Sequence, residues 1–207
     1  MDGRVFLSSR KAVSCAMLLV PLMAAGSRRD GSDQALAESL SNEATRQTAI
    51  ASMAVSGSAK VPLLLSWITK RPRHVDGCGF LDGLVEALGE LKVREAVPFL
   101  VQNIGLRRSC GVSLAPWLKS PAFIEWHFPA VGALVKIGPE ASRAVMVAFD
   151  SMADEDDRMA AMFVVSEVRG VPEARAFLES ALARANRERY WAERGIERLD
   201  STPSSAK

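Results

Sequence analysis

The stretch LVEALGELKVREAVPFLVQNIG, from Leu84 to Gly105, contains two apolar stripes separated by a short charged segment. The stripes are Leu84, Leu88 and Leu91, followed by Val97, Leu100, Val101 and Ile104. Both spacings fit the 3.6-residue period of a helix, and neither fits the two-residue period of a strand. Pro98 is compatible with the second helix because it falls in the first turn, where a missing N–H costs little. The stretch therefore predicts a helical hairpin.

Three other parts of the chain show a similar pattern of two apolar stripes and a joint. They span residues 45–68, 128–152 and 157–185, and each joint contains glycine, proline or both, as in Gly138-Pro139. Self-similarity of this kind predicts a repeat architecture. Equivalent positions are Val55, Leu91, Ile137 and Val168, which are separated by 36, 46 and 31 residues. The long middle step indicates an insertion at residues 105–128.

The amino-acid composition is that expected of a helical protein with a hydrophobic core. The chain has 207 residues, of which 48% are hydrophobic and only 6% are aromatic. A chain of this length and apolar content can bury a sizeable core, as one domain. We expect an all-α fold with about four helical hairpins at residues 45–200, preceded by a lead-in or capping helix at 27–44 and followed by a disordered tail at 201–207.

The first 26 residues have the features of an export signal. A basic segment is followed by an apolar stretch, residues 12–25, which is shorter than the roughly 20 residues that span a bilayer. The small residues Ala24, Ala25 and Gly26 predict cleavage before Ser27. We therefore expect a periplasmic or secreted protein. The alternative is an uncleaved N-terminus that anchors the chain to a membrane.

Cleavage would change both the charge and the cysteine content. Removing residues 1–26 takes three basic residues and one acidic residue, which leaves 23 of each sign. A neutral chain lacks the excess positive charge of nucleic-acid-binding proteins. Cys15 leaves with the signal, and Cys78 and Cys110 remain at the two ends of the quoted hairpin. These ends are adjacent in an antiparallel hairpin, so we predict a Cys78–Cys110 disulfide. The alternative is two unpaired thiols.

A family resemblance supports the repeat interpretation. EALGELKVREAVPFL, from Glu86 to Leu100, resembles the bacterial HEAT-like repeat of the PBS-lyase type, and GALVKIGPEA, from Gly132 to Ala141, is similar to it as well. The resemblance covers roughly residues 45–185 and implies an α-solenoid of stacked hairpins. It says little about function, because the family includes scaffolds, inhibitors and a few enzymes.

Candidate contact residues lie in the insertion. Trp117 and Trp126 could form an aromatic surface for a partner, with His127 beside them, because tryptophan is enriched at binding hot spots. The alternative is that both tryptophans cover the hydrophobic core and that His127 is a packing residue. A basic run, Lys70 to His74, could bind anionic groups or could be a solvated loop between hairpins.

The chemistry-bearing motifs of enzymes were sought and not found. The sequence has no histidine or cysteine cluster with metal-ligand spacing, no glycine-rich phosphate loop and no nucleophile elbow. We therefore expect no catalytic residues, no cofactor and no metal, and predict an exported scaffold that binds another protein, with no role in nucleic-acid binding. The alternatives are a HEAT-fold enzyme, lyase-like or glycosylase-like, and a membrane-anchored accessory domain.

Overall fold

The protein is described by a computed structural model for residues 23–73, 75–108, 124, 125, 127–184, 195–197 and 200. Within those ranges the regular elements are α-helices and short 3-10 helices, and there is no β-strand. The all-α prediction is confirmed. The chain divides into two compact units, Met1–Asp33 and Gln34–Lys207. The described part of the first unit is the beginning of helix α1, and the remaining elements belong to the second unit.

The helices follow one another with short connections. In chain order they are α1 (Met23–Ser41), α2 (Glu43–Ser56), η1 (Gly57–Lys60), α3 (Val61–Thr69), α4 (Gly77–Glu90), η2 (Arg94–Ala96), α5 (Val97–Gln102), α7 (Pro129–Ile137), α8 (Pro139–Ala148), η4 (Phe149–Ser151), α9 (Glu155–Arg169) and α10 (Val171–Arg184). The helix pairs α2–α3, α4–α5, α7–α8 and α9–α10 fall in the ranges predicted for hairpins, and α7 contacts α8 and α9 contacts α10.

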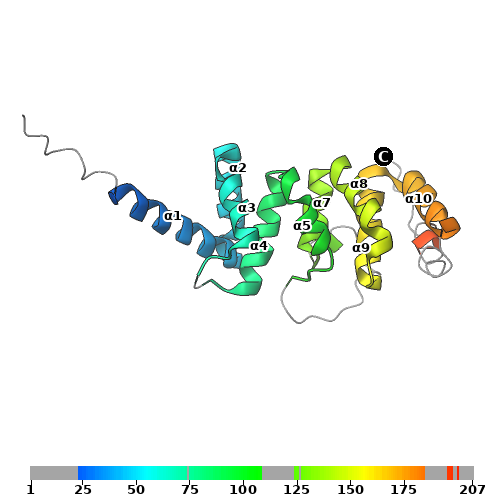
Figure 1. The fold of residues 1–207 in the computed structure, drawn as a ribbon, viewed down its shortest axis with the longest axis horizontal. Coiled ribbons are helices and arrows are strands. Elements are labelled where there is room, and N and C mark those ends of the chain that lie inside the picture. The colour runs from blue at the N-terminus through cyan, green and yellow to red at the C-terminus, as the bar shows by residue number, and fades with distance from the viewer. Residues whose placement is uncertain are drawn as a thin grey trace, which may run out of the picture. The chain divides into compact units, whose positions relative to one another are not determined.

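Within the second unit, consecutive helix pairs contact each other in chain order (Figure 1). The first helices form one series, in which α2 contacts α4, α4 contacts α7, and α7 contacts α9. The second helices pack against this series: α3 contacts α4, α5 contacts α7 and α8, and α8 and α10 contact α9. Each pair therefore buries its apolar stripe against its neighbours in the chain.

The joints within the pairs form for the local reasons that the sequence indicates. Pro98 lies in the first turn of α5, as predicted. Gly138 ends α7 with a φ of 89°, and Pro139 opens α8 directly after it. Gly170 ends α9 in the same way, with a φ of 91°. Glycine adopts these left-handed conformations without a Cβ clash, and proline is preformed for a helix start.

The charged joint of the quoted hairpin is a Schellman motif. Lys92 has a φ of 50°, the N–H of Lys92 donates to the carbonyl of Gly89 at 3.0 Å, and that of Val93 donates to Leu88 at 2.9 Å. These two bonds satisfy carbonyls that the end of α4 would leave open. Val93 is only 3% exposed, which supplies the hydrophobic contact that often accompanies the motif.

The acidic run before α9 lies at a helix N-terminus. Asp154 is the N-cap, and its carboxylate accepts from the N–H of Asp156 at 2.7 Å. Glu155, Asp156 and Asp157 occupy the first turn. Negative charge is favourable there because the N–H groups of the first turn point toward it.

The structure corrects two details of the sequence interpretation. Cys78 lies inside the first turn of α4 rather than before the helix, because α4 begins at Gly77 with Asp76 as its N-cap. Val55 differs from its three supposed equivalents: its side chain is 91% exposed, whereas Leu91, Ile137 and Val168 are partly buried against the core. Spacing alone did not reveal that the side chain of Val55, in the last turn of α2, is exposed.

The contact between α4 and α7 is unusually close and depends on a glycine. A Cβ atom at Gly89 would lie 2.5 Å from the Cα and 2.6 Å from the Cβ of Ala133. No side chain at position 89 fits unless the two helices separate. Gly132, next to Ala133 on α7, has more room, since its nearest neighbour would be the carbonyl oxygen of Glu125 at 3.4 Å.

Replacing Gly89 by alanine should therefore destabilise the second unit. Overpacking of this kind costs about 1–3 kcal/mol, because helix separation also disturbs neighbouring contacts. The matched control is Gly132→Ala, which should be neutral or stabilise by up to about 1 kcal/mol through its better helix propensity. Urea unfolding followed by circular dichroism measures both. Equal stability of the two variants would contradict the close contact.

Candidate functional site

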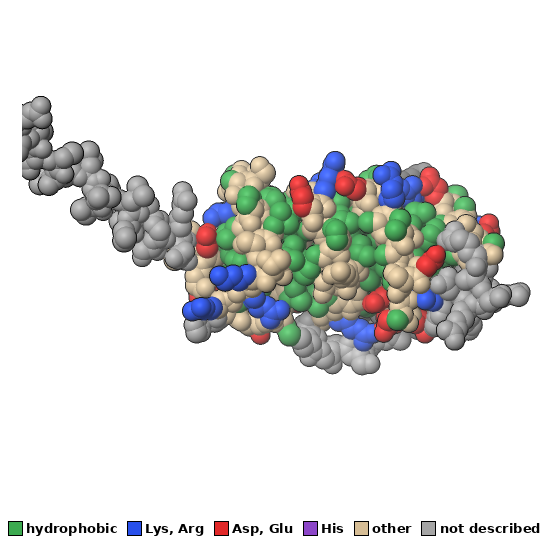
Figure 2. Space-filling view, viewed as in Figure 1, with side chains coloured by type: hydrophobic (Ala, Val, Ile, Leu, Met, Phe, Trp, Pro, Cys, Tyr) green, Lys and Arg blue, Asp and Glu red, His purple; other side chains and the backbone are tan. Residues whose placement is uncertain are grey.

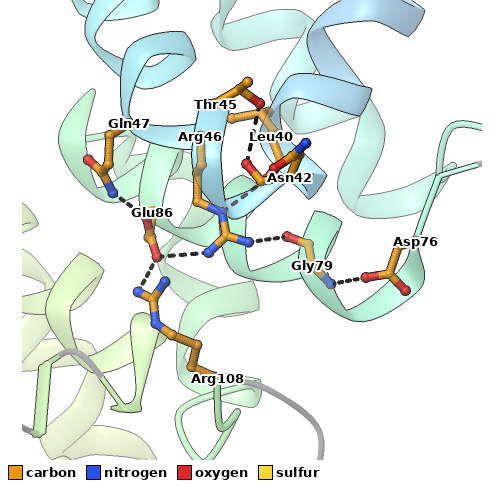
Figure 3. Close-up of polar contacts among 9 residues, drawn as sticks. All are labelled: Leu40, Asn42, Thr45, Arg46, Gln47, Asp76, Gly79, Glu86 and Arg108. Carbon is orange, nitrogen blue, oxygen red and sulfur yellow. Dashed lines mark hydrogen bonds and ion pairs between the residues drawn. The ribbon is translucent and has the colours of Figure 1, made fainter.

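Arg46 on α2 is the buried cation around which the polar residues of the second unit are organised (Figure 3). Its side chain is only 4% exposed. The Nε atom donates to the carbonyl of Leu40 at 3.0 Å, and Nη2 donates to the carbonyl of Gly79 at 3.1 Å. The Leu40 carbonyl lies in the last turn of α1, where helix carbonyls lack an internal partner. Arg46 thus joins the end of α1 to α2 and to the start of α4.

Glu86 on α4 provides the negative charge that compensates this arginine. Its Oε1 atom lies 3.6 Å from Nη1 of Arg46 and also accepts a bond from Nη2 of Arg108, which follows α5. Its Oε2 atom accepts from Nε2 of Gln47 at 2.9 Å. Figure 3 shows the two guanidinium groups converging on the same oxygen of the carboxylate, with Gln47 on its other oxygen. The three charged side chains are between 4% and 12% exposed, so they form a nearly buried ionic cluster.

The arginine contact recurs on α9 in the same local geometry. Asn42 caps α2 by accepting from the N–H of Ala44, and Arg46 follows four residues after this cap. Asp154 caps α9, and four residues later Nε of Arg158 donates to the carbonyl of Met152 at 2.7 Å. In both helices the arginine reaches the carbonyl two residues before the cap. In the sequence this motif appears as an Asn or Asp followed four residues later by Arg, which the apolar stripes do not reveal.

Next to the ionic cluster is a groove of about 250 Å³ between α2, α4 and α7. We call it the α2–α4–α7 groove. Its lining residues are Gln47, Ile50, Glu86, Glu90, Arg108, Glu125, Pro129, Gly132, Ala133 and Lys136. Glu90 and Lys136 form an ion pair across it at 2.7 Å. Most charged groups in this groove are therefore already bound to protein partners of opposite sign.

Glu125 is the carboxylate of this groove with a perturbed ionisation. Burial raises the pKa of Glu125 above its ordinary value, and repulsion from Glu167 raises this pKa further. Lys136 acts in the opposite direction, but its ammonium is bound to Glu90. Glu125 is therefore a carboxylate that the fold holds in an unfavourable place for a charge.

A second, more open groove of about 650 Å³ lies between α8 and α10. We call it the α8–α10 groove, and its lining residues are Arg143, Met146, Val147, Arg169, Glu173, Ala176, Phe177 and Ser180. Val147 is 80% exposed, although it is a large aliphatic residue. Phe177 forms the inner wall and is fixed by an edge-to-face contact with Phe149, whose ring centre is 5.2 Å away. Arg169 is also fixed, since its Nε donates to the hydroxyl of Ser142 at 2.7 Å.

The predicted site residues are distributed as follows. Trp117, Trp126 and Cys110 lie outside the described residues. Cys78 lies in the first turn of α4, and its predicted disulfide with Cys110 stays a prediction. His127 is 7% exposed, and its backbone carbonyl accepts from the N–H of Arg108 at 2.7 Å. Its role in partner contact stays a prediction too. Trp67 packs as expected, 8% exposed and 5.5 Å from the ring of Phe80.

In the described ranges, no group of three or more His, Cys, Asp or Glu side chains could hold a metal ion. Comparisons with known proteins do not assign the site either. No family model matches the chain, and neither the curated proteins nor the solved structures give a match.

Glu86→Gln tests whether the ionic cluster holds the first helix pairs together. The substitution leaves two nearly buried guanidinium groups without their carboxylate, and breaking a buried ion pair costs about 3–5 kcal/mol. The control is Glu90→Gln, one turn later on the same helix, which breaks an ion pair whose members are 44–50% exposed. Exposed pairs are worth about 0–1 kcal/mol. Chemical denaturation should separate the variants, and equal losses would exclude a special role for the cluster.

Glu125→Gln should make the protein more stable at pH 7. The folded state raises the pKa of Glu125, so its charged form opposes folding above that pKa. As the pH falls, the wild-type carboxyl takes up a proton in the fold, and the advantage of the variant should disappear near the ordinary value of 4.5. Thermal unfolding at pH 7 and pH 4.5 measures this difference. The exposed Glu179 provides a control for net charge through Glu179→Gln, and an advantage of Glu125→Gln that persisted at pH 4.5 would contradict the assignment.

Proposed function

We propose that the protein is an exported, non-catalytic scaffold of stacked HEAT-like hairpins that binds another protein in the α8–α10 groove. Three features of the second unit support stacking. Its helix pairs contact in chain order, several second helices open with proline in their first turn, and the cap-and-arginine motif occurs in both α2 and α9. Repeat proteins of this architecture bind partners along extended surfaces.

The exposure of Val147 is the observation on which the choice of the α8–α10 groove depends. Val147, a large aliphatic side chain at 80% exposure, lines this groove together with Met146, Ala176 and Phe177. Apolar surface of this kind, enclosed by polar residues, is typical of a protein-binding site. The residues at the edge are Arg143, Arg169, Glu173 and Ser180.

The charge at the edge indicates what kind of partner segment would fit. Arg143 is exposed, and no ion pair joins it to a carboxylate among the described residues. Arg169 is already bound to Ser142 and lies 3.4 Å from Glu173. A partner segment that inserts an apolar side chain beside Val147 and places a carboxylate near Arg143 would use both features. Specific contact of this type depends on a desolvated apolar centre with polar groups around it.

The charged α2–α4–α7 groove supports catalysis less well. Glu86 is held by three donors and Glu90 by one, so these carboxylates are committed to joining helices. A general acid or base must reach the proton that it transfers. These ion pairs join neighbouring helices, which is a structural reason for the charged residues to lie close together.

A photo-crosslinking amino acid at position 147 tests the proposed binding groove. Expressed in its native host and irradiated, the variant should yield one dominant adduct with a second protein, identified by mass spectrometry. The control places the same amino acid at Val55, another exposed helical valine, at which no such adduct should form. Introducing Arg143→Glu into the position-147 variant should weaken the adduct by about tenfold if a partner carboxylate lies there, since a charged hydrogen bond is worth about 1.5–3 kcal/mol. Identical adducts at 147 and 55 would exclude the groove.

A further inference from the structure

The segment that joins α3 to α4 carries an unneutralised positive charge. Lys70, Arg71 and Arg73 fall within four residues, and all three side chains are exposed. No ion pair joins any of them to a carboxylate in the described part of the chain. Figure 2 shows Lys and Arg side chains gathered at the end of the second unit where α3 leads into α4. We call these three residues the basic cluster.

Among the described residues, the neighbouring groups form no ion pair with this charge: Glu38 on α1 accepts from Nε2 of Gln34 at 3.0 Å, and the same Nε2 donates to the carbonyl of Arg73 at 2.9 Å. The guanidinium of Arg71 lies over the first turn of α4, where its Nη1 atom is 2.8 Å from the position that a Cβ of Gly77 would occupy. The N-terminus of a helix carries partial positive charge itself. The nearest carboxylate in the sequence, Asp76, is used to cap α4 and accepts from the N–H of Gly79 at 2.7 Å. The basic cluster is therefore free to meet an anionic partner.

The helix pair that precedes the basic cluster is apolar and poorly covered. By length and composition, the segment Glu43–Thr69 is long and apolar enough to cross a membrane. Only 17% of its apolar 18-residue stretch is buried inside the protein. Its charged residues are Glu43, Arg46 and Lys60, and Arg46 is enclosed in the ionic cluster. On α3, the aliphatic side chains of Val61, Leu63, Leu65 and Ile68 pack against the core but are only half-buried, so part of each stays exposed.

The backbone excludes a straight span through a bilayer in this structure. Gly57 ends α2 with a φ of 64°, and η1 redirects the chain into α3. The two helices contain 14 and 9 residues, whereas a spanning helix needs about 20. Short helices with exposed aliphatic side chains and neighbouring basic residues lie in the interface of a membrane rather than across it.

We propose that α3 and the basic cluster together form a peripheral binding surface for an anionic phospholipid bilayer. Lys70, Arg71 and Arg73 meet the negatively charged headgroups, and the aliphatic side chains of α3 enter the boundary between headgroups and acyl chains. This surface is separate from the α8–α10 groove and does not require an N-terminal anchor. A protein that bound a partner in that groove would then hold it next to a membrane.

Vesicle binding by the full-length chain tests the surface. Co-sedimentation should show tighter binding to phosphatidylcholine vesicles with 30% phosphatidylserine than to pure phosphatidylcholine vesicles. Each basic residue near an anionic surface contributes about fivefold to binding. Arg71→Ala combined with Arg73→Ala should therefore weaken binding to the anionic vesicles by about 30-fold. High salt should reduce the wild-type preference for anionic vesicles in the same way, because it screens exposed charges.

The matched control removes the same charge elsewhere. Lys92 and Arg94 are also exposed and lie in or next to the joint between α4 and α5, and Lys92 has a φ of 50°, which asparagine tolerates. Lys92→Asn combined with Arg94→Ala should therefore leave vesicle binding within a few-fold of wild type. Equal losses in both double variants, or no preference for anionic vesicles, would overturn the proposal. Displacement by millimolar inorganic phosphate would overturn it as well, because it would assign the basic cluster to a single small anion. Binding to a short DNA duplex through the same two arginines, without vesicle binding, would assign it to nucleic acid instead.

Discussion

The close approach of α4 and α7 is the contact on which the arrangement of the second unit depends. At Gly89 the two backbones come so near that a methyl group at this position would overlap Ala133. Helices that approach this closely bury their aliphatic residues on both sides, and Leu84, Leu88 and Leu134 are at most 1% exposed. The ionic cluster lies next to this contact and joins α2 to α4 through Arg46 and Glu86. Apolar packing and buried charge thus fix consecutive helix pairs by different means.

Both proposed binding surfaces use side chains that lie outside the contact between α4 and α7. The α8–α10 groove is apolar at its centre and lies toward the end of the series, whereas the basic cluster follows the first helix pair. The α2–α4–α7 groove between them is rich in charge, but most of its charged groups are paired. Acidic and basic residues that lie close together in a cleft therefore do not by themselves indicate catalysis, because they can already be paired across neighbouring helices.

Much of the fold follows from local features that a sequence displays. The 3.6-residue period of Leu84, Leu88 and Leu91 predicts α4, and Gly138-Pro139 predicts the joint between α7 and α8. These predictions succeed because helix periodicity and helix ends depend on neighbouring residues. The predicted start of α4 was wrong at Cys78 because the capping residue is Asp76, which the apolar pattern does not mark.

The polar features could not be predicted because they depend on contacts between distant residues. Glu86 reads in the sequence as one exposed position of an amphipathic helix, yet it is nearly buried because Arg46 and Arg108 converge on it from 40 and 22 residues away. Val55 reads as part of an apolar stripe, yet its side chain is exposed. The raised pKa of Glu125 likewise depends on its burial and then on repulsion from Glu167, which is on α9.

Hydrogen exchange of the intact chain can show whether the helix pairs behave as a stacked series in which each pair depends on its neighbours. Leu178→Ala removes a fully buried side chain of α10. In a stacked series the resulting loss of protection should be concentrated in α9 and α10 and should leave α2 and α4 unchanged, because stability is the sum of local and nearest-neighbour contributions. An equal loss of protection in all helices would show one cooperative globule and would contradict the stacked architecture.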